Sequence, residues 1–236
     1  MKIEGPLIPA RFVSRPNRFI TIVEVDGKSV VSHLPDPGRL KEILIPGVEL
    51  LVRPAPKNAH RKTKYSTVMA QKDGQWVSLV SALPNQFVKE ALMKDELPMF
   101  NDFTFIRPEI TKGKHRFDFL LESPSGSPFF LEVKSVTFVN NGLAQFPDAV
   151  TARGTRHAIA LSNIAKSDGP DEAGILFVCQ RPDADRFSPM WERDPVFSKA
   201  LLEAKKSGVT LWCITTHVSK THMQYYREIP LNLAPL

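Results

Sequence analysis

Two acidic residues and a lysine stand in neighbouring segments that have the composition of β-strands. Asp118 lies in RFDFLLE, residues 116–122, and both Glu132 and Lys134 lie in FFLEVKSVTFV, residues 129–139. The linking sequence SPSGSP is rich in Ser, Gly and Pro, which favours a hairpin loop. Cross-strand neighbours in a hairpin lie about 5 Å apart at Cβ, so the two carboxylates are expected to meet.

The hairpin register follows from the centre of the loop. If the loop is centred on Ser125, Asp118 faces Glu132 and Arg116 faces Lys134. Because side chains alternate along a strand, Asp118, Glu132 and Lys134 are expected on one face of the sheet. The other face is apolar and is expected to pack against helices; it comprises Phe117, Phe119, Leu121, Leu131 and Val133.

Two carboxylates at this distance repel each other unless a positive charge lies between them. Mg²⁺ prefers hard oxygen ligands and commonly takes one or two carboxylates, and it can activate water and polarise a phosphoryl group. A nearby lysine can stabilise charge on the phosphate. The pattern therefore fits metal-assisted phosphodiester hydrolysis. The alternative is solvated ion pairs, since acid-x-Lys triplets also occur at Asp26–Lys28 and Glu203–Lys205.

The C-terminal part of the chain mixes helices and strands. The predicted order is α-β-β-β-α-β-α-β, which indicates a mixed sheet flanked by helices. Helices are predicted over 85–97, 151–166 and 197–208, and strands over 103–110, 116–122, 129–139, 173–180 and 209–218.

The N-terminal part is predicted to be all-β. About five short strands in some 80 residues, with turn signals at Asp26-Gly27 and Asp73-Gly74, favour an OB-fold-like barrel. We place the domain boundary near residue 83, giving domains 1–83 and 84–236. Phe12 and Trp76 could be barrel core or could stack on bases, whereas Phe19 is interpreted as core. The predicted strands are 18–25, 29–34, 48–54, 65–71 and 75–81.

Composition excludes several classes of protein. The 236 residues are 42% hydrophobic and 24% charged, which is typical of a folded globular protein. The N-terminal sequence lacks a signal-peptide core, and no apolar run is long enough to span a membrane, so we expect a cytosolic protein. Two cysteines and six scattered histidines indicate neither a disulfide framework nor a zinc site. A net charge of +6 fits a polyanionic partner or an ordinary basic surface.

The Asp…Glu-x-Lys pattern on consecutive strands after a helix resembles the PD-(D/E)xK nuclease superfamily, although Phe117 and not proline precedes Asp118. Longer strings from about residue 10 to the C-terminus resemble the sugar fermentation stimulation protein A (SfsA) family. The resemblance implies an OB-type domain, a nuclease-like domain and DNA binding without marked sequence preference. The strings are NRF (17–19), HLPDPGRL (33–40), RKT (61–63), RFDFLL (116–121), EVKSVTFV (132–139), FPDAVTARGTRH (146–157) and RFSPM (186–190).

The resemblance also implies roles for individual residues. The catalytic set is Asp118, Glu132 and Lys134, and Glu90 is a candidate acid from the first helix, with a surface glutamate as the alternative. The implied metal set is Asp118, Glu132 and Val133, holding Mg²⁺ or Mn²⁺. Candidate DNA contacts are Arg15, Arg18, His33, Arg39, Arg61, Lys62, Lys64, Arg116, Arg153, Arg156 and His157.

Two groups of these contacts stand out. The loop 57–64 holds four Lys or Arg residues and His60, which suits contact with the DNA backbone. Arg153, Arg156 and His157 fall in the first turns of a predicted helix, where they could contact phosphate or form a solvated basic face.

The sequence therefore supports a DNA-binding protein with a metal-dependent nuclease site. The alternative is a non-catalytic DNA-binding protein or a transcriptional regulator of sugar (maltose) metabolism on a nuclease-derived scaffold. RNA stays open as a partner, as does a dimeric state.

Overall fold

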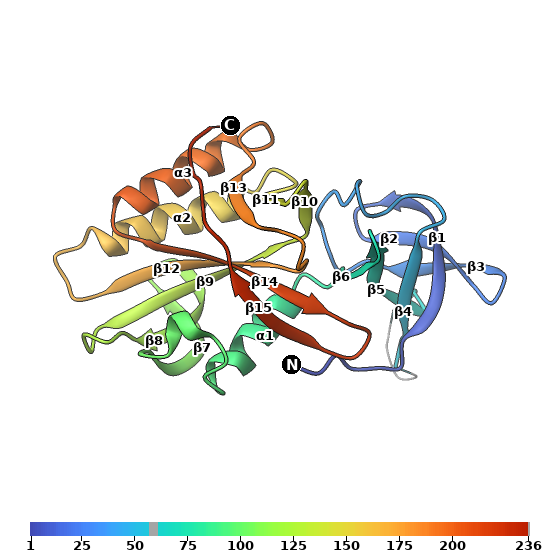
Figure 1. The fold of residues 1–236 in the computed structure, drawn as a ribbon, viewed down its shortest axis with the longest axis horizontal. Coiled ribbons are helices and arrows are strands. Elements are labelled where there is room, and N and C mark those ends of the chain that lie inside the picture. The colour runs from blue at the N-terminus through green and yellow to red at the C-terminus, as the bar shows by residue number, and fades with distance from the viewer. Residues whose placement is uncertain (57–60, 236) are drawn as a thin grey trace. The chain divides into compact units, whose positions relative to one another are not determined.

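The computed structural model spans residues 1–236 and describes all of them except 57–60 and 236 (Figure 1). The chain divides into two compact units. The first comprises Met1–Leu83 together with His217–Gln224, and the second comprises Pro84–Thr216 together with Tyr225–Leu236. The sequence-based division assigned 217–224 to the second domain, whereas in the structure these residues group with the first unit. Lys2 forms a β-bridge with His222 there.

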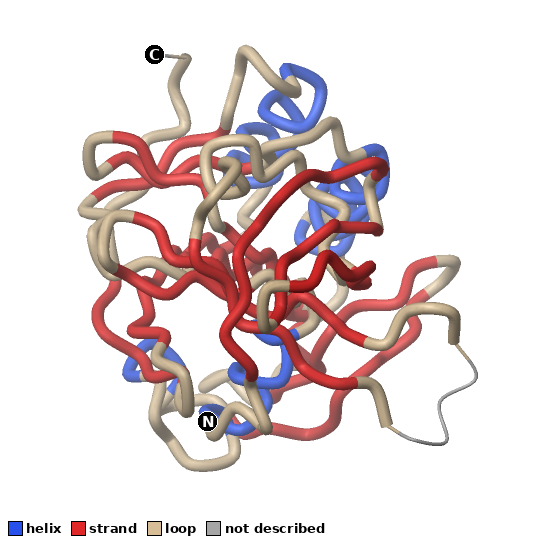
Figure 2. The backbone as a smooth tube through the Cα atoms, turned by 90° about the vertical axis from the view of Figure 1, so that its right-hand side faces the viewer, coloured by secondary structure: helices blue, strands red, loops and turns tan. Residues whose placement is uncertain are grey.

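The first unit is a small barrel whose strands, red in Figure 2, run in the order β3-β2-β1-β4-β5-β6. An additional pairing of β3 with β5 closes five of them into a barrel, which confirms the predicted OB-type fold. The strands are β1 (Ile8–Asn17), β2 (Ile20–Val25), β3 (Lys28–His33), β4 (Glu49–Pro54), β5 (Tyr65–Lys72) and β6 (Gln75–Ser78).

Both predicted Asp-Gly turns are present. Asp26 and Gly27 join β2 to β3 with φ of 49° and 71°, and Asp73 and Gly74 join β5 to β6 with φ of 51° and 76°. Two successive positive φ angles match the right-handed twist of the flanking strands, which is why this dipeptide is favoured. These turns set the hairpin registers of the barrel.

The aromatic residues of the barrel are distributed unevenly. Phe12 is buried in the barrel core, whereas Trp76 is half-buried beneath the ammonium group of Lys220. The expectation that Phe19 is core is wrong, because its side chain is 50% exposed. Phe19 lies in the turn between β1 and β2, where the alternation of buried and exposed side chains along a strand does not apply.

The second unit contains a six-stranded sheet in the order β15-β14-β12-β9-β8-β7. Strand β12 runs parallel to β9 and β14, while β8 runs antiparallel to β7 and β9. A small second sheet has the order β10-β11-β13. The bounds are β7 (Thr104–Lys112), β8 (His115–Glu122), β9 (Pro128–Val136), β10 (Phe138–Asn140), β11 (Leu143–Phe146), β12 (Glu172–Cys179), β13 (Arg186–Pro189), β14 (Thr210–Val218) and β15 (Met223–Glu228).

Helical segments cover both faces of the six-stranded sheet. The adjacent residues Phe129 and Phe130 of β9 point to opposite faces. Phe130 belongs to the core that includes Leu161 and Leu201 of two helices lying side by side in Figure 1. Phe129 meets Phe103 edge to face, and Phe103 in turn meets Phe100 of a 3₁₀ turn edge to face. The predicted mixed sheet flanked by helices is therefore confirmed. The helical segments are α1 (Leu83–Leu92), the 3₁₀ turn η1 (Pro98–Phe100), α2 (Ala152–Ala165) and α3 (Pro195–Lys206).

Two further observations bear on the class of protein. None of the helices in the described part of the chain is long and apolar enough to cross a membrane. Cys179 and Cys213 are free thiols buried in the second unit.

Candidate active site

The β8–β9 hairpin brings the acidic residues together. Its ladder runs from the Glu122–Pro128 pair to the Phe119–Leu131 pair, which is the register expected for a loop centred on Ser125. Gly126, with φ of 81°, supplies the backbone conformation that the loop requires. The ladder with β9 ends at Phe119, so the two strands are no longer paired where the acidic residues begin.

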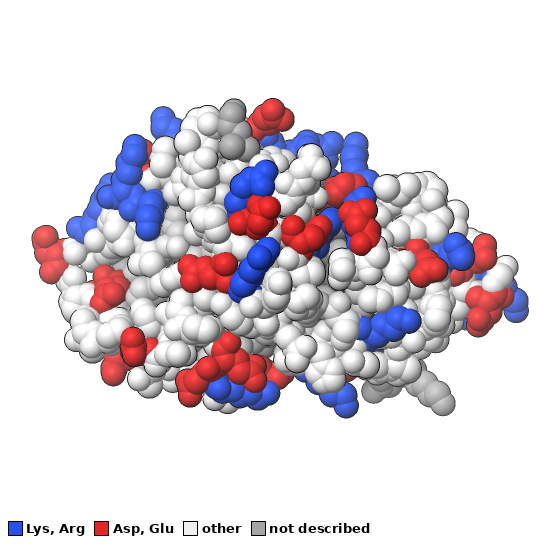
Figure 3. Space-filling model, in the orientation of Figure 1, with Lys and Arg blue, Asp and Glu red and all other residues white. Residues whose placement is uncertain are grey.

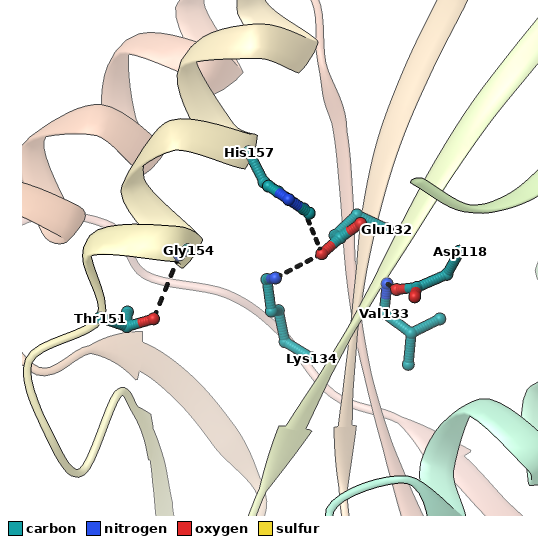
Figure 4. A network of polar contacts seen from close by, with 7 residues as sticks. All are labelled: Asp118, Glu132, Val133, Lys134, Thr151, Gly154 and His157. Atoms are coloured by element: carbon teal, nitrogen blue, oxygen red, sulfur yellow. Dashed lines mark hydrogen bonds and ion pairs between the residues drawn. The ribbon is translucent and has the colours of Figure 1, made fainter. Parts of the chain in front are cut away.

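Asp118 occupies the position where this ladder ends. Its Oδ2 accepts a hydrogen bond of 2.7 Å from the main-chain N–H of Val133, in place of a strand-to-strand bond (Figure 4). The side chain of Asn85, from α1, also hydrogen-bonds the carboxylate. Asp118 and Asn85 line an open groove of about 400 Å³ that Lys89 and Arg107 also border. Asp118 is thus held by two elements and reaches solvent through this groove.

Glu132 lies deeper, and its side chain is only 3% exposed. Its Oε1 accepts hydrogen bonds of 2.6 Å from both Lys134 Nζ and His157 Nδ1, as the dashed lines in Figure 4 show. Its Oε2 is buried and has no hydrogen-bond partner among the residues that the structure describes. A buried carboxylate oxygen without a partner is costly, and a ligand could supply the missing interaction. We call Asp118, Glu132, Lys134 and His157 the carboxylate site.

The two acids are driven in opposite directions by their surroundings. Burial raises the pKa of Asp118 from 3.8 to about 6, and the negative charge of Glu132 adds to the rise. Burial also acts to raise the pKa of Glu132, but the hydrogen bond from His157 and the charge of Lys134 outweigh it and lower this pKa. As the pH falls from neutral, Asp118 therefore takes up a proton near pH 6, while Glu132 stays ionised to lower pH.

His157 is positioned by helix α2. The Thr151 side chain caps this helix by accepting from the N–H of Gly154, and Asp194 in turn accepts from the N–H of Thr151. The predicted role of His157 as a DNA contact is not supported, because the residue is 6% exposed and bonded to Glu132. The spacing of His157 to Leu161 and Ile164 would have predicted its burial, because these residues share the buried face of the helix.

The prediction for the two faces of the hairpin fails at Phe117 and at Asp118, because Asp118 lies beside Asn85 of α1 whereas Glu132 bonds His157 of α2. The ring of Phe117 packs against Phe130 and His157, on the face to which Glu132 points. Beyond Phe119, strand β8 is paired with β7 through Ile110–Phe117 but not with β9. Pairing with β9 therefore does not determine to which face of the sheet the side chains of these β8 residues point.

Two other candidates of the second unit lie on its surface. Glu90 is half-exposed on α1 and pairs with Lys94 at 3.5 Å, while Asn85 is the α1 residue that bonds Asp118. Arg116 is exposed beside Glu109 at 3.9 Å. The structure therefore does not bring Glu90 or Arg116 into the carboxylate site.

The predicted DNA contacts differ in exposure. Arg153 and Arg156 are exposed in the first turns of α2. On the face drawn in Figure 3, Lys and Arg side chains gather over α3, and charges of both signs are interspersed elsewhere. In the barrel, Arg15 is half-buried and His33 intermediate; the exposed group is Arg18, Arg39, Arg61, Lys62 and Lys64. Residues 57–60 of the predicted basic loop, including His60, lie outside the described residues.

The donor set limits how a metal could bind. No group of three or more His, Cys, Asp or Glu side chains suited to a metal occurs in the part of the chain that the structure describes. A cation at the predicted set would have two carboxylates, from Asp118 and Glu132, with the main chain of Val133 and water completing its shell. Mg²⁺ is commonly bound with so few protein ligands.

An OB-type barrel followed by a mixed sheet with an Asp…Glu-x-Lys set on neighbouring strands defines a two-domain protein whose second domain carries the candidate site. The family models agree with this class. The model for the SfsA N-terminal OB domain matches residues 13–79, and the model for the sugar fermentation stimulation protein RE domain matches residues 82–222. The chain therefore belongs to the SfsA family.

Relatives align over nearly the whole chain. The sugar fermentation stimulation protein homolog of Acetivibrio thermocellus is 43% identical over 234 residues, covering 98% of this chain and 99% of that protein. The homolog of Moorella thermoacetica is 40% identical and covers 99% of this chain and 100% of that protein. A solved structure of Pyrococcus furiosus SfsA in complex with Ca²⁺ has a TM-score of 0.86 and 28% identity, covering 98% of both chains.

Proposed function

We propose that this protein is a divalent-metal-dependent phosphodiesterase that binds DNA without strong sequence preference. The observation that carries the proposal is the state of Glu132. One carboxylate oxygen is bonded to Lys134 and His157, whereas the other is buried and has no partner among the described residues. Asp118 lies close enough for the charge of Glu132 to raise its pKa. This is an arrangement that a bound cation would neutralise.

Asp118, Glu132 and the main chain of Val133 would hold the metal, which we propose to be Mg²⁺ or Mn²⁺. The relative from Pyrococcus furiosus was solved with Ca²⁺, another cation that prefers oxygen ligands. When bound, a divalent cation would supply an activated water and an electrophile for the phosphoryl oxygen. The residues of this chain supply the ligands and their orientation.

Lys134 and His157 would have different tasks. Lys134 is 12% exposed, so its ammonium group can reach both Glu132 and a phosphate at the site. We assign it to stabilising the negative charge that develops on the phosphate. His157 is buried and holds Glu132 in place from helix α2, which makes it a positioning residue.

A second candidate is a DNA-binding regulator without turnover, including a regulator of sugar metabolism. The observation in its favour is that the described residues contain no cluster of three metal-binding side chains. RNA is a further substrate that the barrel could accept.

Cleavage assays with a matched pair of variants test the proposal. Supercoiled plasmid, linear duplex, single-stranded DNA and RNA are incubated with protein and Mg²⁺, Mn²⁺ or EDTA. Glu132→Gln should lower the cleavage rate by about 10³-fold, in line with losing a metal-binding, charge-stabilising group. The control Glu203→Gln changes an exposed acid-x-Lys glutamate on α3 and should cleave like the parent.

Two outcomes would contradict the proposal. Undiminished cleavage by Glu132→Gln would exclude the carboxylate site. DNA binding without cleavage by the parent protein in either metal would favour the regulator.

A further inference from the structure

Phe19 is an exposed aromatic ring on a backbone that is held on both sides. Its N–H donates to Asn17 Oδ1 at 2.9 Å, and its carbonyl accepts from the N–H of Leu34 at 2.8 Å. The side chain nevertheless remains 50% exposed. A large apolar ring that is fixed in solvent loses hydrophobic stabilisation, so its exposure invites a functional explanation.

Arg15 brings the main chains of two exposed arginines, Arg18 and Arg39, close to each other. One guanidinium nitrogen of Arg15 donates to the carbonyl of Arg39 at 2.6 Å, and another donates to the carbonyl of Arg18 at 2.8 Å. The turn that carries Phe19 and the loop after β3 are therefore joined through one side chain. The exposed side chains of Arg18 and Arg39 consequently start from neighbouring points.

A third arginine reaches the same end of the barrel through the strand register. Ile20, the residue after Phe19, pairs with His33, and His33 pairs with Ser66. The Ser66 hydroxyl accepts a hydrogen bond of 2.8 Å from Arg61. We call Arg18, Phe19, Arg39 and Arg61 the Phe19 surface. The strand pairing places the main chain of Ser66 about two strand spacings, roughly 10 Å, from that of Ile20, the residue after Phe19.

We propose that the Phe19 surface binds single-stranded DNA, with an unpaired base stacked on the ring and phosphates beside the arginines. This inference rests on the DNA binding proposed above and specifies the form of DNA. The positive charge complements the phosphodiester backbone, and the ring adds an interaction that duplex DNA cannot use, because its base faces are already stacked. A protein partner would be an alternative occupant, and the experiment distinguishes the two.

Anisotropy titrations of the full-length protein in EDTA, which prevents metal-dependent cleavage, test the proposal. The probes are a fluorescent oligothymidylate of about 20 nucleotides and a duplex of equal length. Phe19→Ala should weaken oligothymidylate binding about tenfold, as expected for one lost base–aromatic stack, and change duplex binding less than twofold. Phe19→Leu should behave like Phe19→Ala, and Phe19→Trp should bind like the parent.

The controls separate stacking from folding and from general hydrophobic contact. Val13→Ala removes an exposed apolar side chain outside the Phe19 surface, on β1 and 43% exposed, and should leave both affinities unchanged. Thermal unfolding shows whether each variant is folded. If Phe19→Ala is unstable, Phe19→Trp and Phe19→Leu still test the inference, because Phe19→Trp must retain its affinity for oligothymidylate and Phe19→Leu must lose affinity.

Four results would overturn the inference. Base stacking would be excluded if Phe19→Ala lost the same affinity for single-stranded DNA and for duplex DNA. It would also be excluded if Phe19→Leu bound oligothymidylate like the parent. In either case Phe19 would be left for another role such as a protein contact. Cleavage and binding of DNA by the parent, with no effect of any Phe19 variant, would defeat this inference alone. Failure of the parent to bind either DNA would defeat the proposed function as well.

Discussion

The carboxylate site lies on a hairpin and the Phe19 surface includes a turn, and hydrogen bonds hold both in place. The two places differ in the burial of their side chains. In the carboxylate site, the charged groups are buried and bonded to one another, so their protonation and orientation are controlled. In the Phe19 surface, the main chain is bonded and the side chains face solvent. Burial thus separates groups suited to chemistry from groups suited to binding. Variants of the first should alter turnover, and variants of the second should alter affinity.

The largest effect is expected from the ionisation of Asp118. Its pKa is about 6 in the folded protein and near 3.8 in the unfolded chain. Between these values the folded protein holds a proton that the unfolded chain has lost, so the free energy of unfolding falls as pH rises through this window. Above pH 6 the penalty is at most about 3 kcal/mol. Asp118→Asn should be more stable than the parent at pH 8 without metal.

Urea unfolding in EDTA at a series of pH values measures this difference. The advantage of Asp118→Asn should shrink as pH falls below 6 and vanish near 4. Glu122→Gln, at the exposed end of the same strand, serves as the control and should follow the parent. A pH-independent gap between Asp118→Asn and the parent would show that ionisation of Asp118 is not the cause.

A smaller effect is expected at His157, which sharpens the comparison because this residue was predicted to bind DNA. His157→Ala should lower turnover and metal affinity about 10- to 100-fold, as for other residues that orient metal ligands, and leave the Kd for DNA unchanged. Single-turnover cleavage, Mn²⁺ titration and anisotropy measure the three quantities. Asn163→Ala, exposed on the same helix, should have no effect. His157→Gln, which retains a hydrogen-bond donor, should recover part of the turnover; a weakened Kd with normal turnover would instead restore the DNA-contact interpretation.

The smallest effect is expected at Arg18, and it should appear in DNA affinity and not in turnover. Arg18→Ala should weaken single-stranded DNA binding about threefold and reduce the slope of log Kd against log salt by about one, because one phosphate contact is lost. Turnover at saturating DNA should not change. Lys206→Ala removes the same charge from α3 in the second unit and should leave the Kd and slope as in the parent. An unchanged salt slope in Arg18→Ala would remove Arg18 from the interface.

Local chemistry explains which features could be predicted from the sequence. The Asp-Gly turns and the SPSGSP loop determine backbone geometry within a few residues, so their hairpins and the register of β8 with β9 were predictable. Strand β1 was missed because it contains Pro9 and Pro16 and its register with β2 shifts twice, which hides the period of two.

The remaining differences between the predictions and the structure at the two sites depend on tertiary contacts. Phe19 resembles a strand residue until the turn that contains it is known. His157 looks like part of a basic helix start, and only the packing of α2 on the sheet turns it toward Glu132. Glu90 and Asn85 both lie on α1, and which of them meets Asp118 depends on the rotation of that helix. Such contacts join residues distant in sequence, which periodicity does not encode.

The grouping of His217–Gln224 with the first unit has a consequence for biosynthesis. Ile3 donates a hydrogen bond of 2.7 Å to the carbonyl of Thr221, and Lys2 pairs with His222, so the first unit contains residues from near both ends of the chain. Domains generally fold as units while the ribosome releases the chain from its N-terminus. Here the barrel can form early, but its unit is complete only after almost all of the second unit has emerged. The two units therefore cannot be exchanged separately between related proteins by recombination near residue 83, because this would separate the barrel from residues His217–Gln224.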